Sequence, residues 1–249
     1  MKQIILWIFF GSLSLGYASE REEKIVEYNM KSLYHVYTKE YGLALEYAKL
    51  ACRMGSGESC SNIALMYVNG FINGKVYYFK AHQYYKKACA LKNASACTSA
   101  GMFYEEGLGL NTVYVESAKP YYIEGCQLGS GQACNSLGVI AYKEGHLKKA
   151  IELYLKSCTK TFGLGCYNYA YALERGQGVK EDFKQAVFYY IKGCKLDVGV
   201  SCSSASHMIY RGNGIRENKS LSKEYLEKAC ILKHKPSCVL RKKLFKSNN

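Results

Sequence analysis

The sequence lacks the short motifs by which most metal-dependent enzymes are recognised. No cysteine pair has the C-x2-C spacing of a structural zinc site. The H-E-x-x-H spacing of zinc hydrolases is also missing, and the five histidines are scattered along the chain. These absences argue against a zinc enzyme, and we expect no metal and no cofactor.

Motifs for serine catalysis are incomplete. Penicillin-recognising serine enzymes combine S-x-x-K with S-D-N and K-T-G, and the last two are absent. S-x-x-K occurs twice, beginning at Ser157 and at Ser220, about as often as chance predicts in a chain rich in serine and lysine. No G-x-S-x-G nucleophile elbow follows residue 18. The catalytic residues of any activity are therefore unknown.

Acidic residues are few, with 20 Asp and Glu against 34 Lys and Arg and a formal net charge of +14. This balance favours acidic partners such as anionic surfaces. Solvated helix faces explain the same lysines, which recur in the predicted outer helices. Since the chain is expected to be exported, we do not expect it to bind nucleic acid.

Long apolar runs are absent after the first 18 residues. Residues 1–18 combine Lys2, an apolar run from Ile4 to Phe10, and the small residues Gly16 and Ala18. This pattern predicts a signal peptide cleaved before Ser19, and hence a secreted or periplasmic protein with no membrane span. The alternative is an uncleaved anchor, but the run is shorter than the roughly 20 residues that a spanning helix needs.

What the sequence does have is twelve cysteines in six C-x7-C pairs. Successive pairs begin 37, 37, 32, 36 and 36 residues apart, which is typical of repeats that each contribute a pair of helices. The pairs are Cys52 and Cys60, Cys89 and Cys97, Cys126 and Cys134, Cys158 and Cys166, Cys194 and Cys202, and Cys230 and Cys238. An even cysteine count in an exported chain predicts six local disulfides, each contributing about 2 to 3 kcal/mol.

The residues around the cysteines predict two helices per pair. One helix ends at the first cysteine, as the apolar stripe of Ala186, Tyr190 and Cys194 indicates, and another begins at the second. Small residues four positions after the second cysteine would allow close helix approach. These are Ala64, Gly101, Gly138, Ala170 and Ser206. We expect the recurring tyrosines to pack between helices and the G-x-G turns to end helices.

The predicted architecture is all-α, an α/α superhelical solenoid of helix-turn-helix repeats, each with a C-x7-C disulfide. After the signal peptide, residues 19–40 are expected to form an N-terminal capping helix. The solenoid is expected to cover residues 41–240, and residues 241–249 a basic tail. Pro120 falls within a predicted helix that should tolerate it poorly unless the helix starts late or kinks.

The patterns A-x-x-x-Y-x-K-A-C and G-x-G-V-x-x-D resemble Sel1-like repeats, relatives of the tetratricopeptide repeat. With C-x7-C in every repeat and a signal peptide, the chain resembles the Helicobacter cysteine-rich protein family over residues 41–240, best in Gly165–Cys202. The chain departs from the family's Leu-Gly pattern at Ile63, Ala100, Tyr169 and Ala205. The resemblance implies binding of penicillin-type molecules and, for some members, slow β-lactam hydrolysis.

The resemblance also implies a concave groove lined by the helices that begin at the second cysteine. We expect a peptide, a protein or a small carboxylate-bearing ligand, such as a cell-wall-related or β-lactam molecule, to bind there to a monomeric protein. The candidate groove residues are Asn135, Tyr142, Lys143, Tyr167, Tyr171, Arg175, His207, Tyr210 and Arg211. Tyrosine and arginine are common binding hot spots. The leading hypothesis is a recognition scaffold, and the alternative is a slow β-lactamase.

Overall fold

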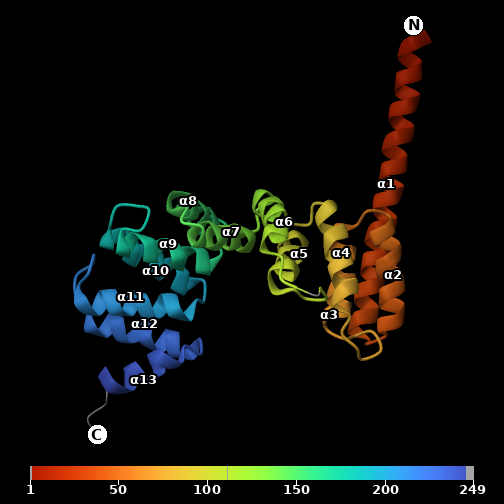
Figure 1. The fold of residues 1–249 in the computed structure, drawn as a ribbon. Coiled ribbons are helices and arrows are strands. Elements are labelled where there is room, and N and C mark those ends of the chain that lie inside the picture. The colour runs from red at the N-terminus through yellow and green to blue at the C-terminus, as the bar shows by residue number, and fades with distance from the viewer. Residues whose placement is uncertain (1, 111, 245–249) are drawn as a thin grey trace. The chain divides into compact units, whose positions relative to one another are not determined.

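A computed structural model of the protein describes residues 2–110 and 112–244, and of residues 2–19 only the backbone is described. In these ranges the chain is all-α, with thirteen helices and no strand (Figure 1). The predicted fold class is thus confirmed. None of the helices in this part of the chain combines the length and the apolar character needed to cross a bilayer.

The chain divides into two compact units, Met1–Glu124 and Gly125–Asn249. The first unit contains α1 (Lys2–Tyr37), α2 (Tyr41–Arg53), α3 (Gly57–Val68), α4 (Tyr78–Ala90), α5 (Ala94–Glu106) and most of α6 (Val115–Gln127). The second contains α7 (Gly131–Lys143), α8 (Leu147–Thr159), α9 (Gly163–Arg175), α10 (Phe183–Lys195), α11 (Gly199–Arg211), α12 (Lys219–Ile231) and α13 (Lys235–Leu244). Within each unit, helices that follow one another in sequence pack side by side (Figure 1).

All six predicted disulfides are present, and no described cysteine is free. In every pair the first cysteine is the penultimate residue of its helix and the second is the fourth residue of the next helix. Only three residues connect the two helices, for example Leu91, Lys92 and Asn93 between α4 and α5. The Cα atoms of the paired cysteines are 4.5 to 4.9 Å apart, within the usual range for a disulfide.

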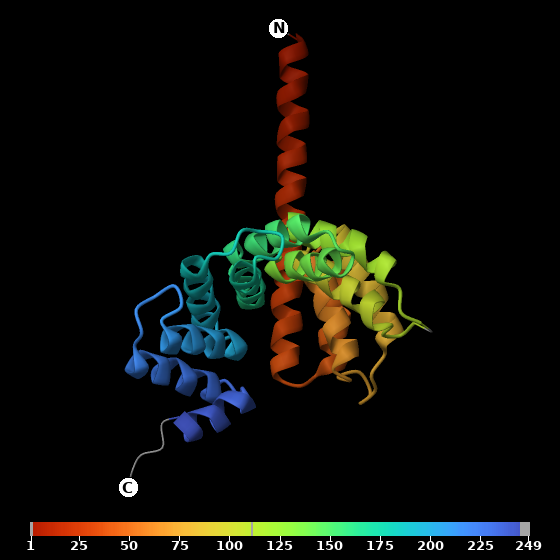
Figure 2. The same cartoon turned by 60° about the vertical axis from the view of Figure 1, so that its left-hand side comes forward.

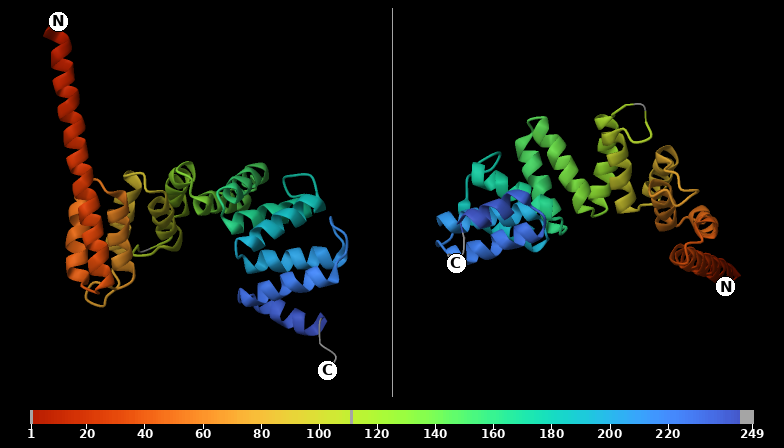
Figure 3. Two further views of the ribbon diagram at one scale, coloured as in Figure 1. Left: turned by 180° about the vertical axis from the view of Figure 1, so that it is seen from behind. Right: turned by 90° about the horizontal axis from the view of Figure 1, so that it is seen from below.

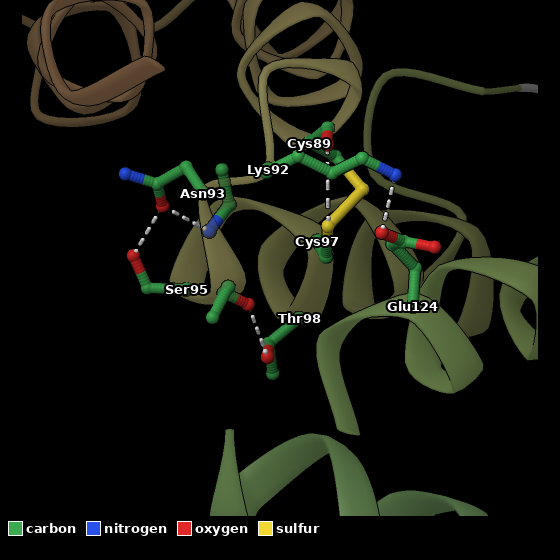
Figure 4. Close-up of a disulfide and its surroundings, with 9 residues drawn as sticks. Cys89, Lys92, Asn93, Ser95, Cys97, Thr98 and Glu124 are labelled. Carbon is green, nitrogen blue, oxygen red and sulfur yellow. Dashed lines mark hydrogen bonds and ion pairs between the residues drawn. A yellow bond between two sulfur atoms is a disulfide. The ribbon is translucent and has the colours of Figure 1, made fainter. Parts of the chain in front are cut away.

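The prediction that each second helix begins at its cysteine was wrong by three residues. The helices begin earlier because the last connecting residue is often a side-chain cap. Asn93 is the example in Figure 4, where its Oδ1 accepts a hydrogen bond of 2.9 Å from the Ala96 backbone N–H. The cysteine therefore lies within the first turn of the helix, directly beside the last turn of the preceding one.

The middle residue of each three-residue connection has a positive φ. Gly55 and Gly129 meet this requirement without strain, whereas Thr161 adopts φ of 60°. A β-branched residue is unfavourable in the left-handed region because its Cβ lies close to the following carbonyl oxygen. The connection imposes this conformation, because three residues must join two helix ends that the disulfide holds together.

We expect Thr161→Gly to raise the free energy of unfolding by about 0.5 to 1 kcal/mol, because relief of left-handed strain exceeds the added entropy of the unfolded chain. Thr159→Gly is the matched control. Thr159 is the last residue of α8, so the same change there should lower stability by about 0.5 kcal/mol. Urea denaturation of both variants measures the difference. Equal signs for the two changes would contradict this account.

The G-x-G turns end helices, as predicted. Gly107, Gly176 and Gly212 are the C-caps of α5, α9 and α11 and adopt φ of 65 to 72°. The second glycine also lies close to another helix: a Cβ at Gly214 would be 2.2 Å from the Phe183 carbonyl oxygen. These turns therefore stop one helix and pack on the start of an earlier one.

Small residues seat the buried tyrosines of the following helix. A Cβ at Gly101 would lie 2.6 Å from Cε1 of Tyr122, and a Cβ at Gly138 would lie 2.6 Å from Cε1 of Tyr154. Both rings are buried, as are Tyr85 and Tyr190 at the same position of other helices. The prediction that these tyrosines pack between helices is confirmed. Close contact between these helices therefore depends on the absence of a side chain at Gly101 and Gly138.

We expect Gly138→Ala to lower the free energy of unfolding by about 1 to 3 kcal/mol, because the Tyr154 ring must leave its seat. Gly42→Ala is the control. Gly42 lies in α2 with no atom within 4 Å of an added Cβ, so alanine there should stabilise the helix by about 0.5 to 1 kcal/mol. Thermal or urea denaturation distinguishes the two. An unchanged free energy of unfolding for Gly138→Ala would show that the Tyr154 ring can shift without cost.

His82 is an anomaly in the core of the first unit. Its side chain is only 1% exposed, and neither ring nitrogen has a hydrogen-bond partner. The ring lies 4.5 Å from that of Tyr104 and 5.6 Å from that of Phe103. Burial, and secondarily the charge of Lys86, lower the pKa of His82 below the ordinary histidine value. The ring is therefore neutral in the folded protein at neutral pH.

We expect the wild type to lose stability as the pH falls through the ordinary histidine pKa of about 6.5, since only the unfolded chain then binds a proton at His82. His82→Leu should remove this contribution and stabilise the protein by about 1 to 3 kcal/mol at neutral pH. Leucine is apt because Leu45 occupies the same position relative to the first cysteine. Urea denaturation at several pH values gives the free energy of unfolding of both proteins, and its slope against pH is compared between the wild type and His82→Leu. Parallel pH profiles would show that His82 is not the responsible group.

Two sequence boundaries differ from the helices observed. Pro120 is the sixth residue of α6, which begins at Val115 rather than after the proline. The helix α13 continues to Leu244, four residues into the segment predicted to be a tail, and residues 245–249 lie outside the described chain. At the other end, α1 runs through the predicted signal peptide and most of the predicted capping segment.

Candidate binding site

The second unit has a hollow of about 350 Å³ between α7, α8, α9 and the turn after α9. Most of its lining is aromatic or amide side chains. The lining residues are Tyr142, Tyr154, Tyr167, Asn168, Tyr171, Ala172 and Gln177. A concave site of this size, apolar with a few polar groups, has the character of a small-ligand or side-chain pocket.

The hollow arises where the repeating pattern of tyrosine and glutamate changes. In two other helix pairs, α5 with α6 and α9 with α10, the hydroxyl of the seated tyrosine donates to a glutamate eight residues after the second cysteine. Tyr122 donates to Glu105 at 2.5 Å, and Tyr190 donates to Glu174 at 2.7 Å. The corresponding residue of α7 is Tyr142. The Tyr142 ring therefore lies where the other pairs have a carboxylate, and the rings of Tyr142 and Tyr154 both line the hollow.

Amide groups give the hollow polar edges. The Tyr142 hydroxyl donates to Oε1 of Gln177 at 3.2 Å, which links the end of α7 to the turn after α9. Nδ2 of Asn168 donates to Oδ1 of Asn135 at 2.8 Å. The Asn168 amide is thereby held in place by a neighbouring helix. Such amides can pair with the carbonyl and N–H groups of an extended peptide.

One wall of the hollow is a row of aromatic rings along α9. The ring centroids of Tyr167 and Tyr171 are 6.3 Å apart, and that of Tyr167 lies 5.7 Å from that of Tyr190. The guanidinium carbon of Arg175 lies 5.2 Å from the centroid of the Tyr171 ring, which is cation–π geometry. The exposed rim beside this wall therefore carries a positive charge.

Tyr154 and Tyr167 act as hydrogen-bond donors in the hollow. Burial, and secondarily Tyr142, raise the pKa of Tyr154 to about 12. Burial also raises the pKa of Tyr167 above the ordinary phenol value. These hydroxyls remain protonated at neutral pH and suit acceptor oxygens such as carbonyls and carboxylates.

The structure brings part of the predicted groove together. Tyr142, Tyr167 and Tyr171 line the hollow, Arg175 stacks at its rim, and Asn135 adjoins it through Asn168. Lys143 is exposed at the end of α7 and does not line it. The three remaining candidates, His207, Tyr210 and Arg211, lie on α11 outside the lining, with Tyr210 beneath the ammonium of Lys219.

Four lining residues were missed from the sequence: Tyr154, Asn168, Ala172 and Gln177. Tyr154 lies at the repeat position of the buried tyrosines that pack between helices. The signal that could have identified it is Tyr142, which stands where α5 and α9 have a glutamate. The others lie on faces of α9 and its turn that the groove positions did not include.

The serine of the first S-x-x-K does not line this hollow. The Ser157 side chain of the first S-x-x-K is fully buried, and its hydroxyl donates to the Gly131 carbonyl at 2.7 Å. That contact gives Ser157 a packing role between α8 and α7. In the portion of the chain that is described, no group of three or more His, Cys, Asp or Glu is placed to hold a metal ion.

Comparisons with known structures identify the repeat. A protective antigen of uropathogenic Escherichia coli with an SLR fold is 22% identical over 83% of this chain, with a TM-score of 0.70. A Sel1 repeat protein from Oxalobacter formigenes is 22% identical and has a TM-score of 0.66, with 76% of each chain covered. Cysteine-rich protein B of Helicobacter pylori is 29% identical over 50% of this chain and 92% of its own, with a TM-score of 0.44.

The chain spans 46% of the length of the Escherichia coli antigen. No curated protein matches the chain in sequence. At these identities the two higher-scoring structures establish the shared fold of the repeats.

The Sel1 repeat pattern matches six segments: residues 37–56, 57–93, 94–130, 131–161, 163–198 and 201–234. The boundaries between them fall within the three-residue connections or next to them, so five of the six disulfides join consecutive matched segments. The sixth joins the last segment to α13. Together the segments cover more than half of the chain and confirm the repeat predicted from the cysteine spacing. The chain therefore belongs to the Sel1 repeat family.

Proposed function

We propose that this protein is an exported recognition scaffold that binds a peptide segment of a partner protein at the hollow of the second unit. The observation that carries the proposal is the aromatic hollow with amide edges and a cationic rim. A Sel1 repeat scaffold is suited to protein binding, because stacked helices present an extended and rigid surface. The six disulfides support export, since they persist in an oxidising environment outside the cytoplasm.

The lining supports a particular mode of recognition. An apolar or aromatic side chain of the peptide would enter between Tyr142 and Tyr167, while Asn168 and Gln177 would pair with the peptide backbone. A carboxylate of the peptide would meet Arg175 at the rim, where a charged hydrogen bond is stronger than a neutral one. Rigid aromatic anchors contribute contact area at a low cost in conformational entropy.

We expect peptides selected by display on the wild-type protein to bind Tyr167→Ala and Arg175→Ala at least about tenfold more weakly, which corresponds to about 1.4 kcal/mol. Tyr78→Ala is the control, because Tyr78 is an exposed tyrosine of the first unit. Calorimetric titration of the same peptide into all four proteins gives the affinities. Unchanged affinity in both hollow variants would show that recognition occurs elsewhere.

The hydrolase alternative is tested with the same proteins. Nitrocefin hydrolysis by the wild type that is lost in Tyr167→Ala, with the circular dichroism unchanged, would favour a slow β-lactamase over a recognition scaffold. Turnover that persists in both hollow variants would not belong to this site.

A further inference from the structure

The helix α1 occupies the place of a first repeat helix that has lost its cysteine. Ser32 Oγ donates to the Ala44 carbonyl at 2.9 Å, as Ser206 Oγ donates to the Ser222 carbonyl at 2.8 Å. Ser206 lies four residues after Cys202, so Tyr28 has the cysteine position in α1. The ends agree too, since α1 stops nine residues after Tyr28 and α11 stops nine residues after Cys202.

In the cysteine-bearing helices, the residue six positions after the second cysteine packs on the preceding helix. Phe103 of α5 is an example, with its ring 5.3 Å from that of Tyr85 and 5.6 Å from that of His82, both in α4. All five equivalents are nearly buried: Met66, Phe103, Ile140, Ala172 and Met208. The same position in α1 is Tyr34, which is 62% exposed. The side of α1 that should meet a preceding helix is therefore uncovered.

This uncovered side is apolar over three helical turns. We call it the α1 outer face, and it consists of Val26, Met30, Leu33, Tyr34 and Tyr37, which are 50 to 86% exposed. Figure 3 shows α1 at the outer edge of the first unit, with α2 on its other side. Terminal helices of solenoids normally present a polar outer face for solubility. An apolar one marks a contact surface.

At the other end of the solenoid, α13 has a charged residue where the other second helices have a small one. Position four after the second cysteine is small wherever a further helix packs on it, as at Gly101 and Gly138. In α13 this position is Lys242, which is exposed. A following helix would meet its ammonium group rather than a seat for a tyrosine ring.

We propose that the α1 outer face binds the same face of a second copy of this chain, as an antiparallel helix pair about a two-fold axis near Met30. The chain's own residues 2–19 cannot cover it, because they continue α1 away from the repeats (Figure 2). Sequential helices within each unit are antiparallel, so this pairing reproduces the packing for which the face is shaped. It also closes after two copies, unlike a head-to-tail contact. This proposal differs from the sequence-based expectation of a monomer.

The charges along α1 favour the antiparallel pair over a parallel one. The first turns after Ser19 carry Glu22 and Glu23, and the residue that follows the helix end at Thr38 is Lys39. A two-fold axis at Met30 brings Glu22 and Glu23 of one copy opposite Thr38 and Tyr37 of the other, next to Lys39. The same axis places Arg21 opposite Lys39, but Arg21 is turned toward the repeats, where its Nε donates to the Met54 carbonyl at 2.9 Å. A parallel pair would instead place the glutamates against each other. Five large side chains per copy bury less than the roughly 800 Å² per partner of a standard complex, so we expect micromolar dissociation.

Sedimentation equilibrium of the exported protein from about 1 to about 300 µM tests the proposal through mass action. We expect a reversible dimer for the wild type and at least about tenfold weaker association for Met30→Glu. At a concentration where the wild type is monomeric, the two melting temperatures should agree, because Met30 is exposed. Phe188→Glu is the matched control, since Phe188 is similarly exposed on α10, and it should dimerise like the wild type. A monomeric wild type throughout this range, or equal association of Met30→Glu, would overturn the proposal.

The geometry has its own test. Because Met30 lies at the axis, Met30→Cys should give a disulfide-linked dimer on a non-reducing gel, whereas Phe188→Cys should not. Lys39→Glu should weaken association, and combining it with Glu22→Lys and Glu23→Lys should restore it. Cross-linking that is equal for both cysteine variants, or the absence of charge-swap rescue, would contradict the antiparallel pairing. Vesicle binding that depends on Met30 in a monomeric protein would instead identify a lipid surface as the occupant.

Discussion

Each C-x7-C disulfide holds the last turn of one helix against the first turn of the next, and the remaining structure depends on this contact. With three connecting residues, the helices must return side by side at close range, and the middle residue must adopt a positive φ. Thr161 adopts that conformation although its β-carbon is branched, which shows that the connection dictates the backbone. The disulfides also stabilise a core that is built largely from alanine, cysteine and tyrosine.

Close helix packing follows from the same constraint. A tyrosine ring fills the space above a residue without a large side chain, as with Tyr122 on Gly101 and Tyr154 on Gly138. The tyrosine hydroxyl then needs a partner, which Glu105 and Glu174 provide in two places. One repeated interaction thus accounts for four of the 24 tyrosines and for the position of two glutamates.

The hollow of the second unit is a local exception to that repeat. At α7 the glutamate is replaced by Tyr142, and the hollow forms beside Tyr154 instead of a buried hydroxyl–carboxylate pair. His82 is a second exception, in which an imidazole occupies a position that is leucine in α2. The α1 outer face is a third, where no helix of the described chain packs on the side of α1 away from α2. Departures from the repeat therefore locate both proposed contact surfaces and the pH-sensitive position in the core.

The sequence by itself determined the helix pairs, the six disulfides and the Sel1 repeat, because a fixed cysteine spacing with an apolar helical stripe admits few other arrangements. It also indicated Tyr142, Tyr167, Tyr171 and Arg175, since residues at equal helix positions share a face. Only the tertiary structure decided that Tyr154 and Gln177 join them while His207, Tyr210 and Arg211 do not. The reason is that a hollow depends on which side chains of neighbouring helices fail to fill the space between them, and repeat position alone does not contain that information.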